Sequence, residues 1–191
     1  GNVIGRRAGA GGRRVMLAAH MDEIGFMVRH IDDKGFLRLQ ALGGFDARVL
    51  FAQRVVVAAR HGGPLRGVLT YSTKPTHLLS PEEGKEAPKV ENVIVDVGLG
   101  ADEVRQRVAV GDMVTMDRTC EICGDQLIGK AMDNRIGLFV MLETLRALGP
   151  HEVELVAVAT VQEEIGLRGA GTAAFAVDPE VGIALDTTLA N

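Results

Sequence analysis

Residues 154–164 read ELVAVATVQEE, in which residues 155–161 are apolar except for Thr160 and three polar residues follow. Two other stretches have the same design: VMLAAH at residues 15–20 and VGIALD at residues 181–186. Strands that are apolar along their whole length, rather than at alternate positions, are typical of sheets buried on both faces. The three runs therefore predict strands of a parallel sheet covered by helices.

Helical segments are expected between these strands. Residues 133–148 carry apolar side chains at helical spacing and are followed by Gly149 and Pro150, a common helix stop. Residues 166–177 are rich in Ala and Gly, lie between the second and third runs of the sheet, and are a candidate crossover helix. The order helix, strand, helix, strand indicates an α/β architecture.

The middle of the chain has a different character. Short β-branched stretches alternate with turn signals such as DDKG at residues 32–35 and HGGP at residues 61–64. We therefore expect a mixed-sheet α/β domain, formed by residues 1–30 and 125–191, that is interrupted by a small barrel-like β-rich domain at residues 31–124. Within this insertion, the charged and proline-containing residues 79–88 predict a mobile loop.

Composition excludes several classes of partner. The 191-residue chain has a net charge of −4 and lacks a cluster of Lys and Arg, which argues against binding to nucleic acid or to an anionic membrane. Its apolar runs are shorter than the roughly 20 residues that span a bilayer. Cys120 and Cys123 are too few for a secreted disulfide framework, so a cytoplasmic location is expected. Their C-x-x-C spacing predicts core or turn cysteines, because a structural zinc site would need four ligands.

Polar residues follow each of the three buried runs. His20 follows the first, the Glu163–Glu164 pair follows the second and Asp186 follows the third, while Asp133 opens the predicted helix. In open α/β sheets, sites form outside the carboxyl ends of the strands. We therefore expect these side chains to converge, although they lie far apart in sequence.

The local spacings fit a metal site, and each has a simpler alternative. Residues i and i+2 of an extended chain share a face, so Asp22 is placed to accept the free N–H of a metal-binding His20. The alternative is a strand-end histidine beside a turn-capping aspartate. Adjacent strand residues point to opposite sides, so one of Glu163 and Glu164 is placed to bind a metal while the other polarises water. Here the alternative is a solvated strand end.

Four motifs together resemble those of the tetrahedral aminopeptidases, dinuclear enzymes that include glutamyl and deblocking aminopeptidases. Residues 19–28 (AHMDEIGFMV) resemble the family's first metal-ligand motif, and residues 129–135 (GKAMDNR) its bridging-aspartate motif. Residues 161–170 (VQEEIGLRGA) resemble its Glu-Glu segment, and residues 184–187 (ALDT) its later aspartate-ligand motif. The motifs occur in the family's order across nearly the whole chain, and the opening Gly1-Asn2 is also similar.

The resemblance implies roles for individual residues. The implied metal ligands are His20, Asp133, Glu164 and Asp186. Asp133 would bridge two divalent cations, with His20 and Asp186 on one cation and Glu164 on the other. Glu163 would be the general base, and Asp22 would orient His20. The family's metals are zinc or cobalt, and sometimes manganese.

The resemblance also implies a substrate, an assembly and a longer chain. The substrates would be peptides with a free N-terminus, and the inserted β-rich domain would help to build a homo-oligomeric dodecamer. The family's catalytic domain begins before the position of Gly1 and continues past that of Asn191, where it supplies a final histidine ligand, so this sequence is expected to be a fragment. Two alternatives stay open: a catalytically incomplete remnant that acts as an interaction module, and another dinuclear amidohydrolase.

Overall fold

The structure is a computed structural model that describes residues 1–72, 78, 80–82 and 88–189. It divides into two compact units. The sheet unit consists of residues 1–23 and 126–191, and the barrel unit consists of residues 24–125. Most of the loop predicted at residues 79–88 lies outside the described residues.

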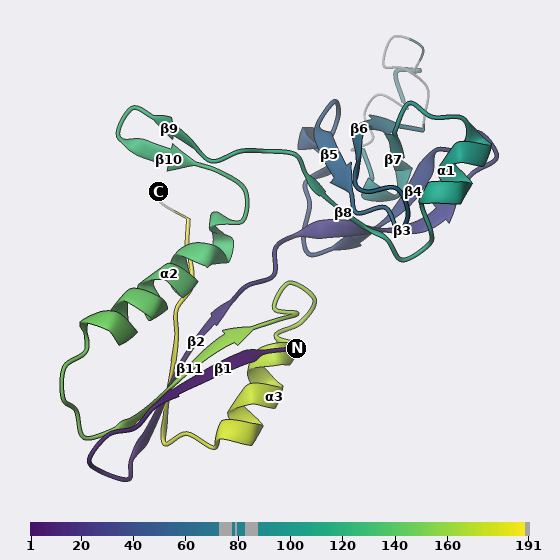
Figure 1. Cartoon of the computed structure of the whole chain (residues 1–191). Helices are drawn as coiled ribbons and strands as arrows, with labels where there is room; N and C mark the ends of the chain where they lie inside the picture. The colour runs from purple at the N-terminus through teal and green to yellow at the C-terminus, as the bar shows by residue number, and fades with distance from the viewer. Residues whose placement is uncertain (73–77, 79, 83–87, 190–191) are drawn as a thin grey trace. The chain divides into compact units, whose positions relative to one another are not determined.

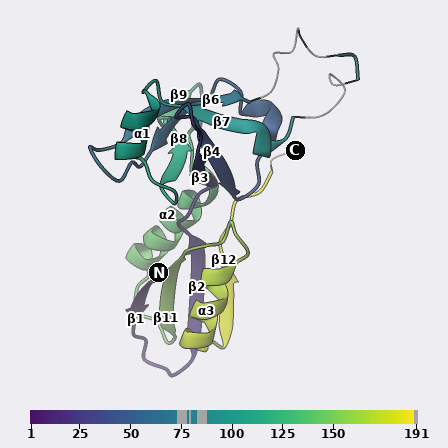
Figure 2. The same ribbon diagram turned by 90° about the vertical axis from the view of Figure 1, so that its right-hand side faces the viewer.

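The sheet unit is built on a four-stranded mixed sheet in the order β1-β11-β2-β12, of which Figure 1 labels the first three strands and Figure 2 labels all four. Its strands are β1 (Val3–Arg7), β2 (Arg14–His20), β11 (Glu154–Thr160) and β12 (Val181–Ala184). Strands β11 and β12 both run parallel to β2, whereas β1 is antiparallel to β11. The three unbroken apolar runs are thus the three parallel strands, as the sequence predicts.

Two helices cover the opposite faces of this sheet, and Figure 2 shows them on either side of β2 and β11. Helix α2 (Met132–Ala147) packs on one face, where Leu17 and Met141 share a buried cluster. Helix α3 (Arg168–Val177) packs on the other face, where Met16 lies in a second cluster. Adjacent residues of β2 therefore face different helices, and each is buried. This double burial explains why β2 and β11 are apolar throughout rather than at alternate positions, whereas the apolar residues of the edge strand β12 are exposed.

The barrel unit is a closed six-stranded barrel in the order β3-β4-β7-β6-β5-β8. Its strands are β3 (Gly25–Ile31), β4 (Leu37–Leu42), β5 (Arg54–Val57), β6 (Leu65–Tyr71), β7 (Val93–Asp96) and β8 (Met113–Met116). The unit also contains α1 (Ala101–Arg107) and two short 3-10 helices, Ala47–Val49 and Val90–Asn92. Its interior is filled by apolar side chains such as Leu37, Leu69 and Val95. The predicted barrel-like insertion is thus confirmed as part of the fold.

The entry into the barrel differs from the boundary that the sequence indicated. The sequence pattern places residues 24–30 in the α/β domain, but residues 25–31 form strand β3 of the barrel. Phe26 and Val28 are fully buried in the barrel core, and β3 pairs with both β4 and β8. The apolar stretch after His20 therefore belongs to a different hydrophobic core from the apolar stretch before it.

A short hairpin, β9 (Glu121–Cys123) and β10 (Gln126–Ile128), leads from the barrel towards α2. Cys123 ends β9 directly before Gly124, which has the positive φ of a tight turn. Cys120 and Cys123 are free and exposed, so they are not the core cysteines that the sequence allowed. Among the helices of the described residues, none is both long and apolar enough to cross a membrane.

Candidate metal centre

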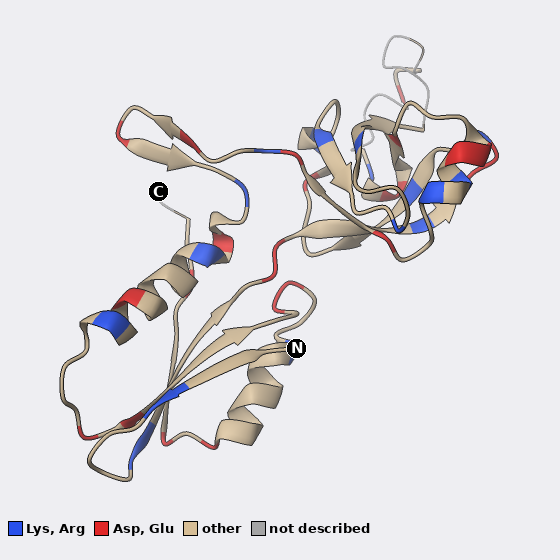
Figure 3. Cartoon of the chain, viewed as in Figure 1, with Lys and Arg blue, Asp and Glu red and all other residues tan. Residues whose placement is uncertain are grey.

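The strand register brings the carboxyl ends of β2, β11 and β12 together. His20, the last residue of β2, pairs directly with Thr160, the last residue of β11. The N–H of Leu185, just past β12, donates to the carbonyl of Ala18 at 2.8 Å, which keeps Asp186 at the same edge. Figure 3 shows acidic residues at the ends of β2 and β11 and at the start of α2.

His20 lies at the centre of this edge and is 3% exposed. Its Nδ1 lies 3.0 Å from the carbonyl oxygen of Asp22, an acceptor that fixes the imidazole with its proton on Nδ1. The lone pair of Nε2 is then available to a cation. Nε2 faces three carboxylates, with Asp133 Oδ1 at 3.0 Å, Asp186 Oδ1 at 3.8 Å and Glu163 Oε2 at 3.9 Å.

The side chains form two overlapping groups with the composition of a metal site. The first group is His20, Asp133 and Asp186, and the second is His20, Glu163 and Glu164. Within each group the potential ligand atoms lie within 4.8 Å of one another. An imidazole with several carboxylates is a donor set that suits zinc and other divalent transition metals. So many carboxylates at one edge repel one another, and a cation relieves that repulsion. The residues present therefore fit a divalent metal centre.

The electrostatics of the group reflect this crowding. Burial raises the pKa of Glu164, and the neighbouring charge of Glu163 raises it further. For His20, burial lowers the pKa, but the hydrogen bonds with Asp133 and the Asp22 carbonyl and the charge of Glu163 outweigh it. The net pKa of His20 lies above its ordinary value of 6.5. Both groups thus hold protons more readily than they would in water.

Asp22 contacts His20 through two of its oxygens. Its backbone carbonyl lies 3.0 Å from His20 Nδ1 and is the nearer acceptor, while its carboxylate Oδ1 lies 3.5 Å from the same nitrogen. The carboxylate also accepts from the backbone N–H groups of Glu163 at 3.2 Å and of Glu164 at 3.3 Å. Asp22 therefore links the histidine segment to the Glu-Glu segment.

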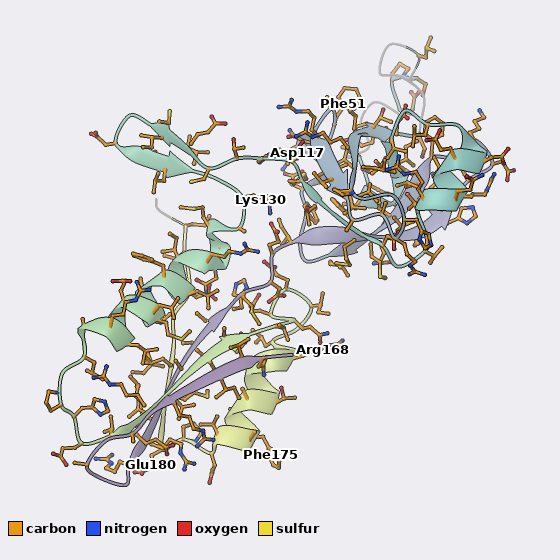
Figure 4. All side chains as sticks on the ribbon, in the orientation of Figure 1. Phe51, Asp117, Lys130, Arg168, Phe175 and Glu180 are labelled. Carbon is orange, nitrogen blue, oxygen red and sulfur yellow. The ribbon has the colours of Figure 1, made fainter. Side chains whose placement is uncertain are left out.

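Two further contacts at this edge escaped the sequence reasoning. Asn134 is completely buried, and its Nδ2 donates to the carbonyl of Leu185 at 2.7 Å, which joins the start of α2 to the chain just before Asp186. The Nζ of Lys130 (Figure 4) donates to both carboxylate oxygens of Glu23, at 2.6 and 2.9 Å. Asn134 and Lys130 both lie inside the quoted motifs, but their partners are distant in sequence, so no local spacing indicates these contacts.

Known proteins match the chain over its full length. Residues 1–191 match the M42 glutamyl aminopeptidase family. The chain is 41% identical over 199 residues to a lysyl aminopeptidase of Pyrococcus furiosus, covering 100% of this chain and 55% of that protein.

Solved structures agree with this match. A TET aminopeptidase from a marine sediment Thaumarchaeota archaeon has a TM-score of 0.92 and 36% identity, covering 100% of this chain and 55% of that one. The Pyrococcus horikoshii TET1 peptidase, which can assemble into a tetrahedron or a large octahedral shell, has a TM-score of 0.83 and 32% identity, covering 97% and 56%. The chain thus spans about half the length of these relatives.

The motifs and the matches lead to the same family. The four motifs that resemble tetrahedral aminopeptidases lie on β2 and the segments around α2, β11 and β12, and the family match covers all of them. The resemblance drawn from the sequence is therefore confirmed. The chain belongs to the M42 glutamyl aminopeptidase family.

Proposed function

We propose that this chain forms part of a metal-dependent aminopeptidase that removes N-terminal residues from peptides. The observation that carries the proposal is the convergence of His20 Nε2 with the carboxylates of Asp133, Glu163 and Asp186 at one edge of the sheet. This convergence supports a hydrolytic metal centre, and the family match supports a free N-terminus as the substrate feature.

Four residues would hold the metal: His20, Asp133, Glu164 and Asp186. We assign His20 and Asp186 to one cation and Glu164 to the other, with Asp133 between them because a carboxylate has two oxygens. Two divalent cations, zinc or cobalt and sometimes manganese in this family, would polarise the scissile carbonyl and acidify a water molecule. The final histidine that the resemblance implies would come from sequence beyond residue 191.

Glu163 would move the proton. Its carboxylate faces the same cluster, with Oε2 3.9 Å from His20 Nε2, and its backbone N–H is held by Asp22. From this position it would accept a proton from the attacking water and deliver it to the leaving amine. Glu164, the neighbouring residue, is assigned to the cation, and burial and the charge of Glu163 raise its pKa.

Metal analysis combined with matched substrates tests the function. We expect the chain with its natural ends to bind two divalent cations and to hydrolyse peptides with a free N-terminus but not their N-acetylated counterparts. A preference for blocked peptides would instead indicate another dinuclear amidohydrolase. Absence of both metal and hydrolysis would indicate a non-catalytic remnant or an interaction module.

Metal binding is expected to weaken in mild acid. Because the pKa of His20 is raised above 6.5, protons compete with the cation for Nε2 at a higher pH than they would for a free imidazole. Glu164 adds to this competition, since its pKa is also raised. The rate of hydrolysis should therefore fall as the pH is lowered, and excess zinc or cobalt should shift this acidic limb of the pH–rate profile to lower pH. Rates measured across pH at two metal concentrations check this, and an acidic limb that does not shift with metal concentration would contradict it.

The barrel unit is our candidate for the oligomerisation domain, and a dodecamer is the proposed assembly. The ability of the Pyrococcus horikoshii relative to assemble into a tetrahedron supports the proposal. The mass of the chain with its natural ends, measured by light scattering, would show a dodecamer or refute it.

We also propose a cytoplasmic location. Cys120 and Cys123 are both free and exposed, which suits a reducing compartment because exposed thiols oxidise readily elsewhere. Cell fractionation with an antibody to the chain tests this.

A further inference from the structure

Asn2, from the Gly1-Asn2 opening that the proposed chemistry leaves unused, contacts the segment that carries Glu163 and Glu164. Its Nδ2 donates to the carbonyl of Gly169 at 2.8 Å, and its Oδ1 accepts from the backbone N–H of Val161 at 3.1 Å. Strand register explains this position, because Val3 pairs with Ala159, so Asn2 lies beside the end of β11. One amide therefore bridges both ends of residues 161–169.

We propose that Asn2 is a positioning residue that holds residues 161–169 in the geometry the metal centre needs, an inference that rests on the proposed aminopeptidase function. Within the described part of the chain, the Asn2 side chain hydrogen-bonds to Gly169, Thr172 and Val161 and not to Glu163 or Glu164, so it acts through the backbone that carries them.

The backbone conformation of residues 161–169 is unfavourable by itself, so contacts from outside the segment are needed to stabilise it. Gln162 and Leu167 both have positive φ, at 59° and 56°, a conformation that residues other than glycine adopt only where their surroundings impose it. Internal hydrogen bonds close the segment on itself, with the N–H of Gly169 donating to Val161 at 3.0 Å and that of Gly166 to Glu163 at 2.9 Å. These bonds shape the segment from within. The Asn2 amide adds a contact from outside, from the residue just before β1, that reaches both ends of the segment.

The fit around Gly169 shows how closely the amide is held. A Cβ atom on Gly169 would lie 2.2 Å from the carbonyl oxygen of Val161 and 2.5 Å from Asn2 Oδ1. The amide thus occupies the space that a side chain would take. Its orientation is determined by its partners, since a carbonyl faces the amide nitrogen and an N–H faces the amide oxygen. Aspartate has the same shape but lacks the donor.

A second anchor acts on the middle of the segment. The Asp22 carboxylate accepts from the N–H groups of Glu163 and Glu164, while Asn2 holds the two ends. With Asn2 removed, the segment keeps its contacts with Asp22 and its continuity with β11 and α3, and loses the amide bridge between its two ends. We therefore expect altered placement of the two glutamates rather than loss of the fold.

The test compares Asn2→Asp and Asn2→Ala with Asn92→Asp, the same chemical change in the barrel unit, all in the chain with its natural ends. Three measurements are made: amide hydrogen exchange of residues 161–169, cobalt titration followed by visible absorbance, and kcat with KM. Asn2→Asp should be the most affected, because it places a carboxylate oxygen opposite the Gly169 carbonyl. Asn2→Ala removes the amide without adding a charge. If Asn2→Asp does not fold, Asn2→Ala therefore tests whether the amide holds residues 161–169.

For both Asn2 variants we expect exchange in residues 161–169 to accelerate by about tenfold or more, with unchanged exchange in β7. Asn2 acts one step further out than a group bonded directly to a metal ligand, whose loss costs about 10–100-fold, so we expect kcat to fall by about tenfold, with altered cobalt absorbance. KM should change by less than about threefold. Asn92→Asp should resemble the unmodified chain.

Unchanged exchange at residues 161–169, or equal effects of the Asn2 and Asn92 variants, would overturn the proposal. If the unmodified chain neither bound cobalt nor hydrolysed peptides, the proposed function would fail. The exchange result would still show whether Asn2 holds the segment, so the two failures can be told apart.

Discussion

Replacement of Glu163 by Gln is expected to abolish peptide hydrolysis while leaving the metal content nearly unchanged. The amide keeps the size of the side chain but cannot accept a proton from water at neutral pH. A positioned general base typically contributes about 10²–10⁴-fold to a rate, so a loss of at least about 100-fold in kcat is expected. Metal analysis and kcat are measured on the same preparation, in the chain with its natural ends.

The adjacent residue provides a matched control. Glu164→Gln changes the same functional group one position along the chain, but we place Glu164 on a cation. It should therefore lose metal as well as activity, and added zinc or cobalt should restore part of the rate. No metal should restore Glu163→Gln. If Glu163→Gln retained a near-normal rate with full metal, or if both variants lost metal equally, the roles assigned to the two glutamates would be wrong.

Replacement of Asp133 by Asn is expected to cause the largest loss of metal affinity. Asp133 Oδ1 lies 3.0 Å from His20 Nε2, and we place this carboxylate between both cations. The substitution removes a negative charge and one shared anionic ligand, so the binding of both cations is weakened. Competition against a chelator at fixed pH measures the affinity independently of activity.

Asp22→Asn is the comparison for this second prediction. The Asp22 carboxylate contacts the backbone of Glu163 and Glu164 rather than a cation, so its loss should cost about 10–100-fold in affinity or rate. Its backbone carbonyl, which accepts from His20, is unaffected by the change. We therefore expect a clearly smaller metal loss than in Asp133→Asn. Equal losses in the two variants would contradict the assigned positions.

The sheet and the position of the site were predictable because both depend on local patterns. Burial on two faces leaves unbroken apolar runs, and the polar residues at their ends mark the edge where parallel strands finish. His20, Glu163 and Asp186 were accessible to this reasoning. The start of the barrel was not predictable in this way. Residues 25–31 include apolar side chains, as the stretch before His20 does, and nothing in the local sequence shows that Phe26 belongs to a different core.

Other contacts of the site could not be predicted from the sequence because they join residues that lie far apart in it. Asn134 contacts the carbonyl of Leu185, and Asn2 contacts residues 161 and 169. A side chain that hydrogen-bonds to a distant backbone leaves no periodicity and no spacing by which to recognise it. The resemblance to a family located these asparagines within motifs but assigned them no contact. The contacts of the Asp22 carboxylate with the backbone of Glu163 and Glu164 were not predictable for a related reason, since they depend on where the chain turns after β2.

The division of the sheet unit into residues 1–23 and 126–191 has a consequence for how the metal centre forms during folding. His20 and Asp133 can meet only when the whole intervening barrel has been enclosed as a loop. The barrel is continuous in sequence and is free to fold first, which shortens that loop before the sheet closes. The closure entropy rises only slowly with loop length, by about 0.6 kcal/mol for each doubling. The barrel can therefore grow or shrink with little effect on the stability of the sheet, whereas a barrel that fails to fold delays the assembly of the centre.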